Sequence, residues 1–184
     1  MGWWRLARRG SLFLLVAIGI SLLSLVALAQ KERDDRFCVA CHLHEEKFDR
    51  FRAPAAKDLA SAHHRAKTSV RCIDCHGGAD LGMRLRVWTV AGLDTVRFLV
   101  GRYGEPDHMR LPLRDQECKQ CHEPILSPTR RASLRKDAFH VLREHRDIKY
   151  RCVACHTGHT LGEARFQFVD SDRVAPICRD CHKE

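Results

Sequence analysis

All ten cysteines of the chain stand in Cys-x-x-Cys pairs, and a histidine follows each pair directly. The five motifs are Cys38, Cys41 and His42; Cys72, Cys75 and His76; Cys118, Cys121 and His122; Cys152, Cys155 and His156; and Cys178, Cys181 and His182. Cys-x-x-Cys-His is typical of c-type haem attachment, in which both thiols bond to the porphyrin and the histidine binds the iron. By chance alone, histidine after all five pairs has a probability on the order of one in a million, which disfavours the zinc and disulfide interpretations. The sequence therefore predicts five covalently bound haem c groups.

Seven further histidines are candidates for the opposite face of each iron: His44, His63, His64, His108, His140, His145 and His159. His159 lies three residues after His156 and cannot bind the same iron from the other side, so we expect it at a neighbouring haem. We expect His140 and His145 at two different haems, and one of His63 and His64 at another, with His64 favoured by an internal repeat. The predicted second ligands are thus His63, His64, His140, His145 and His159. Because only one of His63 and His64 is expected to bind, these residues account for four irons. The second ligand of the fifth iron is left among His44, His108, a methionine (Met83 or Met109) and an open site.

The composition favours a small helical domain with a large bound group. The formal net charge is +9, and much of the 45% hydrophobic fraction lies in the first thirty residues or is cysteine. Haem propionates would offset much of the positive charge, and basic runs interleaved with aromatic residues, which mark nucleic-acid binding, are absent. We predict a mainly α fold with much irregular structure, in which short helices and loops wrap five haems. Residues 81–103 and 130–146 are predicted helices, the second carrying His140 and His145.

The amino terminus carries an apolar segment long enough to cross a bilayer. Residues 11–29 are uncharged and mostly apolar, and Arg5, Arg8 and Arg9 precede them. We therefore predict a cytoplasmic segment over 1–10, a transmembrane signal-anchor over 11–30 and an exported domain over 31–184. Positive charge on the amino-terminal side places that domain in the periplasm of a bacterium. Residues 27–29 also form an Ala-x-Ala cleavage pattern, so a removable signal peptide is the alternative.

The motif spacing suggests internal repetition. The first cysteines of successive motifs are 34, 46, 34 and 26 residues apart. The repeated interval predicts two related di-haem units, at about 37–78 and 117–158, with a fifth haem at 176–184.

The layout resembles the NapC/NirT family of membrane-anchored multihaem quinol dehydrogenases. The likeness lies in the amino-terminal anchor, the motif at Cys38 soon after it, the stretch Val70–His76, a basic amphipathic helix, and the motifs at Cys118 and Cys152. It implies quinol oxidation at the membrane face, with charged residues after the second motif near the quinol; in that segment lie Arg84, Arg86 and Asp94. Members typically carry four haems, so the fifth motif departs from the pattern, and the methionine expected after the first motif has no counterpart beside His42.

The last forty residues resemble instead the soluble pentahaem donor of cytochrome c nitrite reductase, and the anchored pentahaem subunit of alternative complex III has a similar layout. The favoured function is a membrane-anchored relay from quinol to a periplasmic redox protein or reductase, with membrane lipid and quinol as partners, no nucleic acid, and a homo- or hetero-oligomer allowed. The alternative is a pure protein-to-protein electron carrier, either soluble after signal cleavage or a subunit of a larger respiratory complex. A small enzyme with one open haem iron is a third reading.

Overall fold

A computed structural model describes residues 3–66, 70–106, 108–122, 127–133, 139–145, 150–163 and 168–183. The described elements are α1 (Trp3–Lys31), α2 (Asp35–Cys38), α3 (Glu45–Arg52), α4 (Leu59–Arg65), α5 (Cys72–His76), α6 (Leu81–Leu99), α7 (Asp115–Lys119), α8 (Pro128–Ser133), the 3-10 turn η1 (Arg143–His145), α9 (Cys152–Cys155) and α10 (Ser171–Arg179). Among the described residues, the β-type pairing is limited to an isolated bridge between His156 and Val169. The predicted mainly helical fold with much irregular structure is confirmed.

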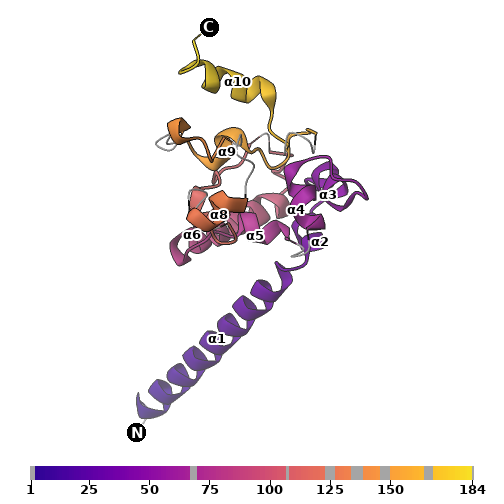
Figure 1. The fold of residues 1–184 in the computed structure, drawn as a ribbon. Coiled ribbons are helices and arrows are strands. Elements are labelled where there is room, and N and C mark those ends of the chain that lie inside the picture. The colour runs from indigo at the N-terminus through magenta and orange to yellow at the C-terminus, as the bar shows by residue number, and fades with distance from the viewer. Residues whose placement is uncertain are drawn as a thin grey trace.

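Helix α1 projects away from the rest of the chain (Figure 1). Residues Ala7–Lys31 are long and apolar enough to cross a membrane, a property that signal sequences share. The hydroxyls of Ser11 and Ser21 donate to the carbonyls four residues earlier, at 3.0 and 2.9 Å, so neither is left unpaired in an apolar environment. The predicted span of 11–30 lies wholly within this continuous helix.

The described part of the body has almost no conventional hydrophobic core. Its buried apolar side chains are Phe51 and Phe168, whereas several polar side chains are buried, among them Glu32, Asp58 and Glu117. So little buried apolar surface would not stabilise a domain of this size without a staple or a bulky bound group. This is the interior expected if bound porphyrins supply the apolar material.

The five motif helices contact one another in chain order. Helix α2 packs on α5, α5 on α7, α7 on α9, and α9 on α10. In Figure 1 this series leads from the end of α1 to the carboxyl terminus at the opposite end of the body. The motif helices therefore lie in single file, each next to the following one, and not as a cluster around one point. We call this arrangement the motif file.

One contact recurs in the two halves of the body. The Cys72 N–H donates to Asp35 and the Cys152 N–H donates to Asp115, each at 2.9 Å, and each aspartate lies three residues before the first cysteine of the preceding motif. This shared contact is compatible with two related units, whose boundaries stay a prediction.

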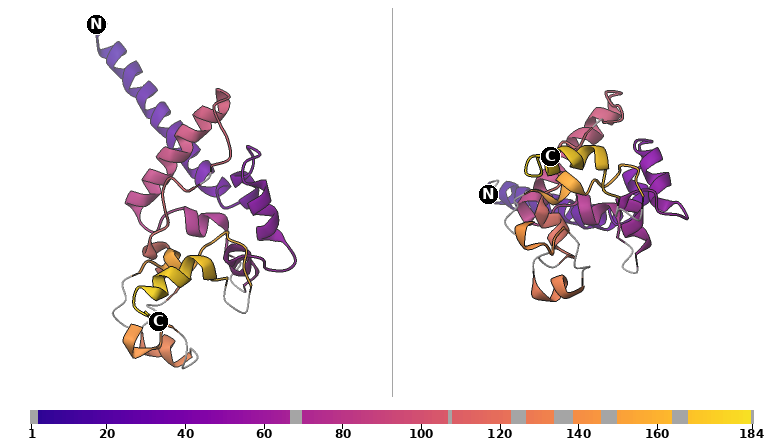
Figure 2. Two further views of the ribbon diagram at one scale, coloured as in Figure 1. Left: turned by 90° about the horizontal axis from the view of Figure 1, so that it is seen from above. Right: turned by 45° about the horizontal axis from the view of Figure 1, so that its top comes forward.

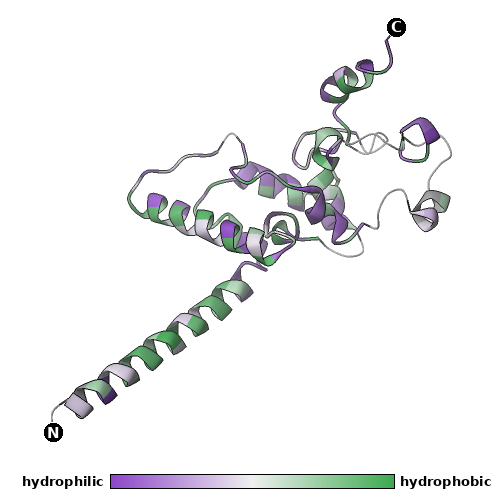
Figure 3. Ribbon diagram, turned by 90° about the vertical axis from the view of Figure 1, so that its left-hand side faces the viewer, coloured by the Kyte–Doolittle hydropathy of each residue, from purple (hydrophilic) through white to green (hydrophobic). Residues whose placement is uncertain are grey.

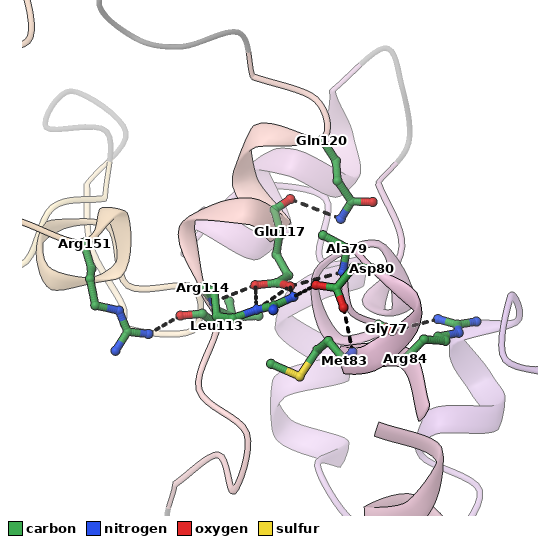
Figure 4. A network of polar contacts seen from close by, with 10 residues as sticks. All are labelled: Gly77, Ala79, Asp80, Met83, Arg84, Leu113, Arg114, Glu117, Gln120 and Arg151. Carbon is green, nitrogen blue, oxygen red and sulfur yellow. Dashed lines mark hydrogen bonds and ion pairs between the residues drawn. The ribbon is translucent and has the colours of Figure 1, made fainter. Parts of the chain in front are cut away.

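A polar network joins the second motif to the third (Figure 4). Arg114 binds Asp80 at 2.7 Å and Glu117 at 2.6 Å, and Glu117 accepts from the Ala79 N–H at 3.1 Å. Arg151 reaches back to the Leu113 carbonyl. Because Glu117 is buried, these bonds fix how α7 lies against the turn that follows α5.

Helix α6 is shorter than the predicted helix over 81–103. It begins at an N-cap, where Asp80 accepts from the Met83 N–H at 2.8 Å, and it ends at Leu99. Gly101 has a φ of 72°, a left-handed conformation that is common just after a helix and stops it.

The predicted continuous helix over 130–146 is wrong in the residues that the structure describes there. Helix α8 ends at Ser133, His140 lies in a turn, and His145 lies in η1; residues 134–138 and 146 fall outside the described residues. The rings of Phe139 and His145 stack with centroids 4.3 Å apart. Residues six apart point in different directions on an α-helix, so the chain must turn to make this contact.

The end of α1 is tied to the start of α6 through Glu32. This carboxylate is 7% exposed, pairs with Arg84, and accepts from the Trp88 indole N–H at 3.1 Å. Arg84 also donates to the Gly77 carbonyl at 3.1 Å. The link fixes where α1 leaves the body.

We expect Glu32→Gln to lower the free energy of unfolding by about 1–2 kcal/mol, since it weakens a partly buried charged pair without removing all of its hydrogen bonds. The matched control is Asp49→Asn, an exposed carboxylate in α3. Guanidinium unfolding of the detergent-solubilised holoprotein measures both. Equal midpoints for the two variants would show that the Glu32 link contributes nothing.

Candidate functional site

Four motif histidines each face a histidine from elsewhere in the chain. Ring centroids are 6.0 Å apart for His76 and His159, 6.2 Å for His140 and His156, 5.8 Å for His63 and His122, and 6.0 Å for His145 and His182. The first two pairs are nearly parallel, with interplanar angles of 18° and 26°, and the other two are close to perpendicular, at 83° and 86°. Each pair joins one motif histidine to one histidine that the sequence nominated as a second ligand.

This spacing fits a metal held between two imidazoles. A metal–imidazole nitrogen bond is about 2 Å long and the nitrogen lies about 1 Å from its ring centroid, so two axial rings have centroids about 6 Å apart. Direct van der Waals stacking of two such rings would bring them closer. The donor set therefore fits haem iron with two histidine ligands, beside the two thiols that each motif supplies.

Burial keeps several of these histidines neutral. Desolvation lowers the pKa of His76 to about 4, and it also lowers the pKa of His140, His156 and His159. The buried Nδ1 of His159 has no hydrogen-bond partner among the described residues. Neutral imidazole is the form that binds a metal, so these sites are electrostatically prepared for ligation.

Thiols of the first and second motifs contact each other, and so do thiols of the third and fourth. The Cys72 thiol contacts Cys38 and lowers the pKa of Cys38, and the thiols of Cys118 and Cys152 also contact each other. Burial raises the pKa of Cys75 to about 11 and that of Cys152 to about 12. All ten cysteines are free of disulfides, so every thiol is available for thioether formation.

Helix α4 positions the histidine that faces the third motif. His63 donates from Nδ1 to the Leu59 carbonyl at 2.8 Å, which leaves Nε2 for another partner. The helix begins at Leu59, and its N-cap residue Asp58 is fully buried and forms a capping box with Ser61. The internal repeat favoured His64, whereas the structure turns His63 toward His122. The His64 ring instead packs on Phe51 with centroids 4.1 Å apart.

The segment that carries His159 is bound to the start of α4. The Ala60 N–H donates to the Gly158 carbonyl at 2.9 Å, and the Arg50 guanidinium donates to the His159 carbonyl at 3.3 Å. Arg50 also contacts Asp58 at 3.4 Å. The residues around Asp58 thus position two of the facing histidines, His63 and His159, at once.

The first motif differs from the other four. The side chain of His42 is 85% exposed and its Nδ1 lies 2.8 Å from Glu45, and the ring contacts of the described residues include none for His42. His44 is held instead by Glu105, with its Nδ1 2.6 Å from a carboxylate oxygen. The second ligand of this motif stays open among the alternatives that the sequence left.

The three charged residues nominated for quinol do not converge. Arg84 pairs with Glu32 and lines a cavity of about 180 Å³ together with Arg33, Arg71 and Asp74. Asp94 pairs with Arg97 at 2.9 Å and Arg110 at 2.6 Å, while Arg86 is exposed. Ten residues of helix place Asp94 about 15 Å along the axis from Arg84, so the two do not share one site.

The sequence reasoning missed the acidic residues that hold the motifs in place. These are Glu32, Asp35, Asp58 and Asp115. One signal was present for two of them, because Asp35 and Asp115 both stand three residues before a motif cysteine. The N–H of Cys152 lowers the pKa of Asp115, so this contact favours the ionised carboxylate.

The chain is similar to a protein of Allochromatium vinosum whose name describes it as a tetraheme cytochrome c type. The two are 25% identical over 142 residues, which cover 66% of this chain and 70% of the relative. This similarity supports a multihaem c-type cytochrome. It thereby supports covalently bound haem c and electron transfer, while the count of five haems and the NapC/NirT likeness stay predictions. No family model matches the chain, and no solved structure matches it.

Proposed function

We propose that this multihaem cytochrome is a membrane-anchored pentahaem relay that takes electrons from membrane quinol and passes them to a periplasmic redox partner. The observation that carries the proposal is the file of motif helices from α2 to α10, each in contact with the next. A relay needs such a file, because electrons pass between neighbouring centres.

In this proposal each motif holds one haem through its two cysteines and its histidine, and the facing histidines complete four of the sites. His159 would serve the second motif, His63 the third, His140 the fourth and His145 the fifth. Haem iron supplies one-electron redox chemistry when bound, at a potential that the axial ligands and burial set.

The two ends of the file suggest where electrons enter and leave. The first motif follows α1 directly, so it lies beside the membrane if α1 is retained. Cys178 and Cys181 of the fifth motif are exposed at the far end of the body, where a protein partner could approach (Figure 1). Quinol would lose two electrons and two protons near the first motif. Of the nominated residues, Arg84 lines the cavity at the end of α1, whereas Arg86 and Asp94 lie farther along α6.

A second candidate function is a protein-to-protein carrier without a quinol site. It is favoured by the Ala-x-Ala pattern at 27–29 and by the resemblance of α1 to a signal sequence. Cleavage after Ala29 would release the whole motif file from the membrane.

The test is anaerobic reduction of the purified full chain in lipid vesicles by a menaquinol analogue, with dithionite giving the total reducible haem. We expect menaquinol to reduce haem at a rate proportional to the amount of vesicle-bound cytochrome. A chain that dithionite reduces and menaquinol does not, or a mature protein that begins at Gln30, would contradict the quinol relay and favour the soluble carrier.

A further inference from the structure

Helix α6 carries an uncharged face that is exposed along its whole length. Five of its apolar side chains and the C-cap residue leave between 51% and 76% of their surface exposed: Leu81, Leu85, Leu93, Val96, Leu99 and Val100. At 3.6 residues per turn they fall within an arc about 120° wide, which we call the Leu/Val stripe. The other positions in this arc are two glycines and Thr89, so it contains no charge. Continuous apolar patches of this kind are uncommon on soluble surfaces and mark an interaction site.

The polar side chain within the Leu/Val stripe is satisfied by the helix itself. The Thr89 hydroxyl donates to the Leu85 carbonyl at 2.8 Å. Ser11 and Ser21 do the same in α1, the segment apolar enough to span a membrane. The stripe can therefore enter an apolar environment without leaving a hydroxyl proton unpaired.

Helix α6 lies on the side of the body from which α1 leaves. The left panel of Figure 2 and Figure 3 both place α1 and α6 at the end opposite the carboxyl terminus, with α6 running across the direction of α1 rather than along it. The bonds from Glu32 to Arg84 and Trp88 join the end of α1 to the first half of α6. If α1 crosses a bilayer, α6 therefore lies at the surface of that bilayer.

Basic side chains flank the stripe. Arg86 and Arg97 follow its edge, and Arg102 comes just after the helix. Among the described residues, Arg86 and Arg102 form no ion pair, so their charges are available to an external anion. Trp88 lies near the other edge, half-buried, as an aromatic side chain suited to the headgroup region. Leucines on one face, arginines beside them and an aromatic residue at the rim are the features of a helix that lies in a membrane interface.

We propose that α6 lies in the plane of an anionic phospholipid bilayer, with the Leu/Val stripe among the acyl chains and Arg86 and Arg102 at the lipid phosphates. Together with α1, it would hold the body in one orientation, with the first motif toward the membrane. The inference deepens the proposed function and rests on it for the retention of α1 in the membrane and, in its test, for haem attachment at all five motifs.

The test compares two variants that each introduce one cysteine, Val96→Cys on the stripe and Ala91→Cys as the control. Ala91 is exposed and lies about 140° around the helix from the centre of the stripe. In the proposed pentahaem protein the ten native cysteines are held in thioether bonds, so a membrane-impermeant maleimide reports the introduced thiol. The full holoprotein is placed in vesicles of phosphatidylcholine and phosphatidylglycerol, and rates are normalised to those in denaturant. We expect Val96→Cys to react at least about tenfold more slowly than Ala91→Cys, because an apolar environment raises the pKa of a thiol and removes the reactive thiolate. Leu93→Cys is the second stripe variant, and haem content is measured for each protein.

Equal rates for the stripe and control variants would overturn the proposal. Protection that is seen in native membranes but not in the purified vesicles would overturn it too, since a protein partner would then cover the stripe. Vesicles of phosphatidylcholine alone should protect less if the arginines bind anionic lipid. Menaquinol reduction is measured on the same vesicles. Protection without reduction would contradict the quinol relay and still support the membrane contact of α6.

Discussion

Replacing His159 with alanine should convert one haem of the oxidised protein from low-spin to high-spin. The His159 ring faces His76 with centroids 6.0 Å apart. If His159 binds the iron of the second motif as proposed, its removal would leave water or an open position there. Electron paramagnetic resonance of the air-oxidised holoprotein would show the high-spin signal. With five haems bound as proposed, the high-spin fraction should correspond to about one haem in five, since each iron takes its own axial ligands.

Two further variants make the His159 result specific. His159→Met restores a second ligand, so we expect a low-spin spectrum with one potential raised by on the order of 100 mV, within the range of about 0.8 V that axial ligands command. Leu161→Ala, at an exposed side chain two residues along the same segment, should change neither signal. A wholly low-spin His159→Ala protein with its full complement of haem would contradict the pairing of His159 with His76.

Replacing Asp58 with alanine should lower the free energy of unfolding by about 3 kcal/mol, because it removes a buried carboxylate that caps a helix and pairs with a guanidinium. Asp58 is fully buried and accepts from the Ser61 N–H at 2.8 Å and its hydroxyl at 2.7 Å, with Arg50 at 3.4 Å. The loss of this carboxylate would also disturb two of the facing histidines. Helix α4 carries His63, and the segment bound to the start of α4 carries His159.

Guanidinium unfolding of the detergent-solubilised holoprotein, followed by far-ultraviolet circular dichroism, measures the effect of Asp58→Ala. The control is Asp49→Ala, an exposed aspartate of the neighbouring helix α3, which we expect to change stability by less than about 0.5 kcal/mol. If the two variants unfold alike, the Asp58 network does not hold the facing histidines in place.

The covalent chemistry of this chain could be predicted from local sequence, because a haem attachment motif is complete within five residues. The position of His159 beside a motif histidine other than His156 was also accessible, since two ligands of one iron must approach it from opposite faces. The apolar segment that forms α1 could be recognised from its composition, and the start of α6 from the Asp80 that precedes it. Each of these predictions depends on neighbours in the chain.

Features that depend on distant contacts could not be predicted in the same way. His63 and His64 are adjacent on one helix and point about 100° apart, so the choice between them depends on how α4 rotates against the body. In the structure the His64 ring packs on Phe51, which leaves His63 to face His122. The family resemblance places Arg84 near quinol, which stays a prediction; its pairing with Glu32, 52 residues away, which joins α1 to α6, could not be foreseen from the sequence. The turn at His140 likewise follows from a ring contact that helix periodicity does not reveal.

The most direct test of the central claim is the intact mass of the denatured, purified protein, which keeps thioether-bound haem and loses any group held by coordination alone. The five motifs predict five haems, and retention of the anchor predicts a chain that begins at Met1. Four haems or fewer on a full-length chain would contradict the pentahaem assignment. The same mass locates the amino terminus, and a chain that begins at Gln30 with five haems would keep the cytochrome and remove the anchor.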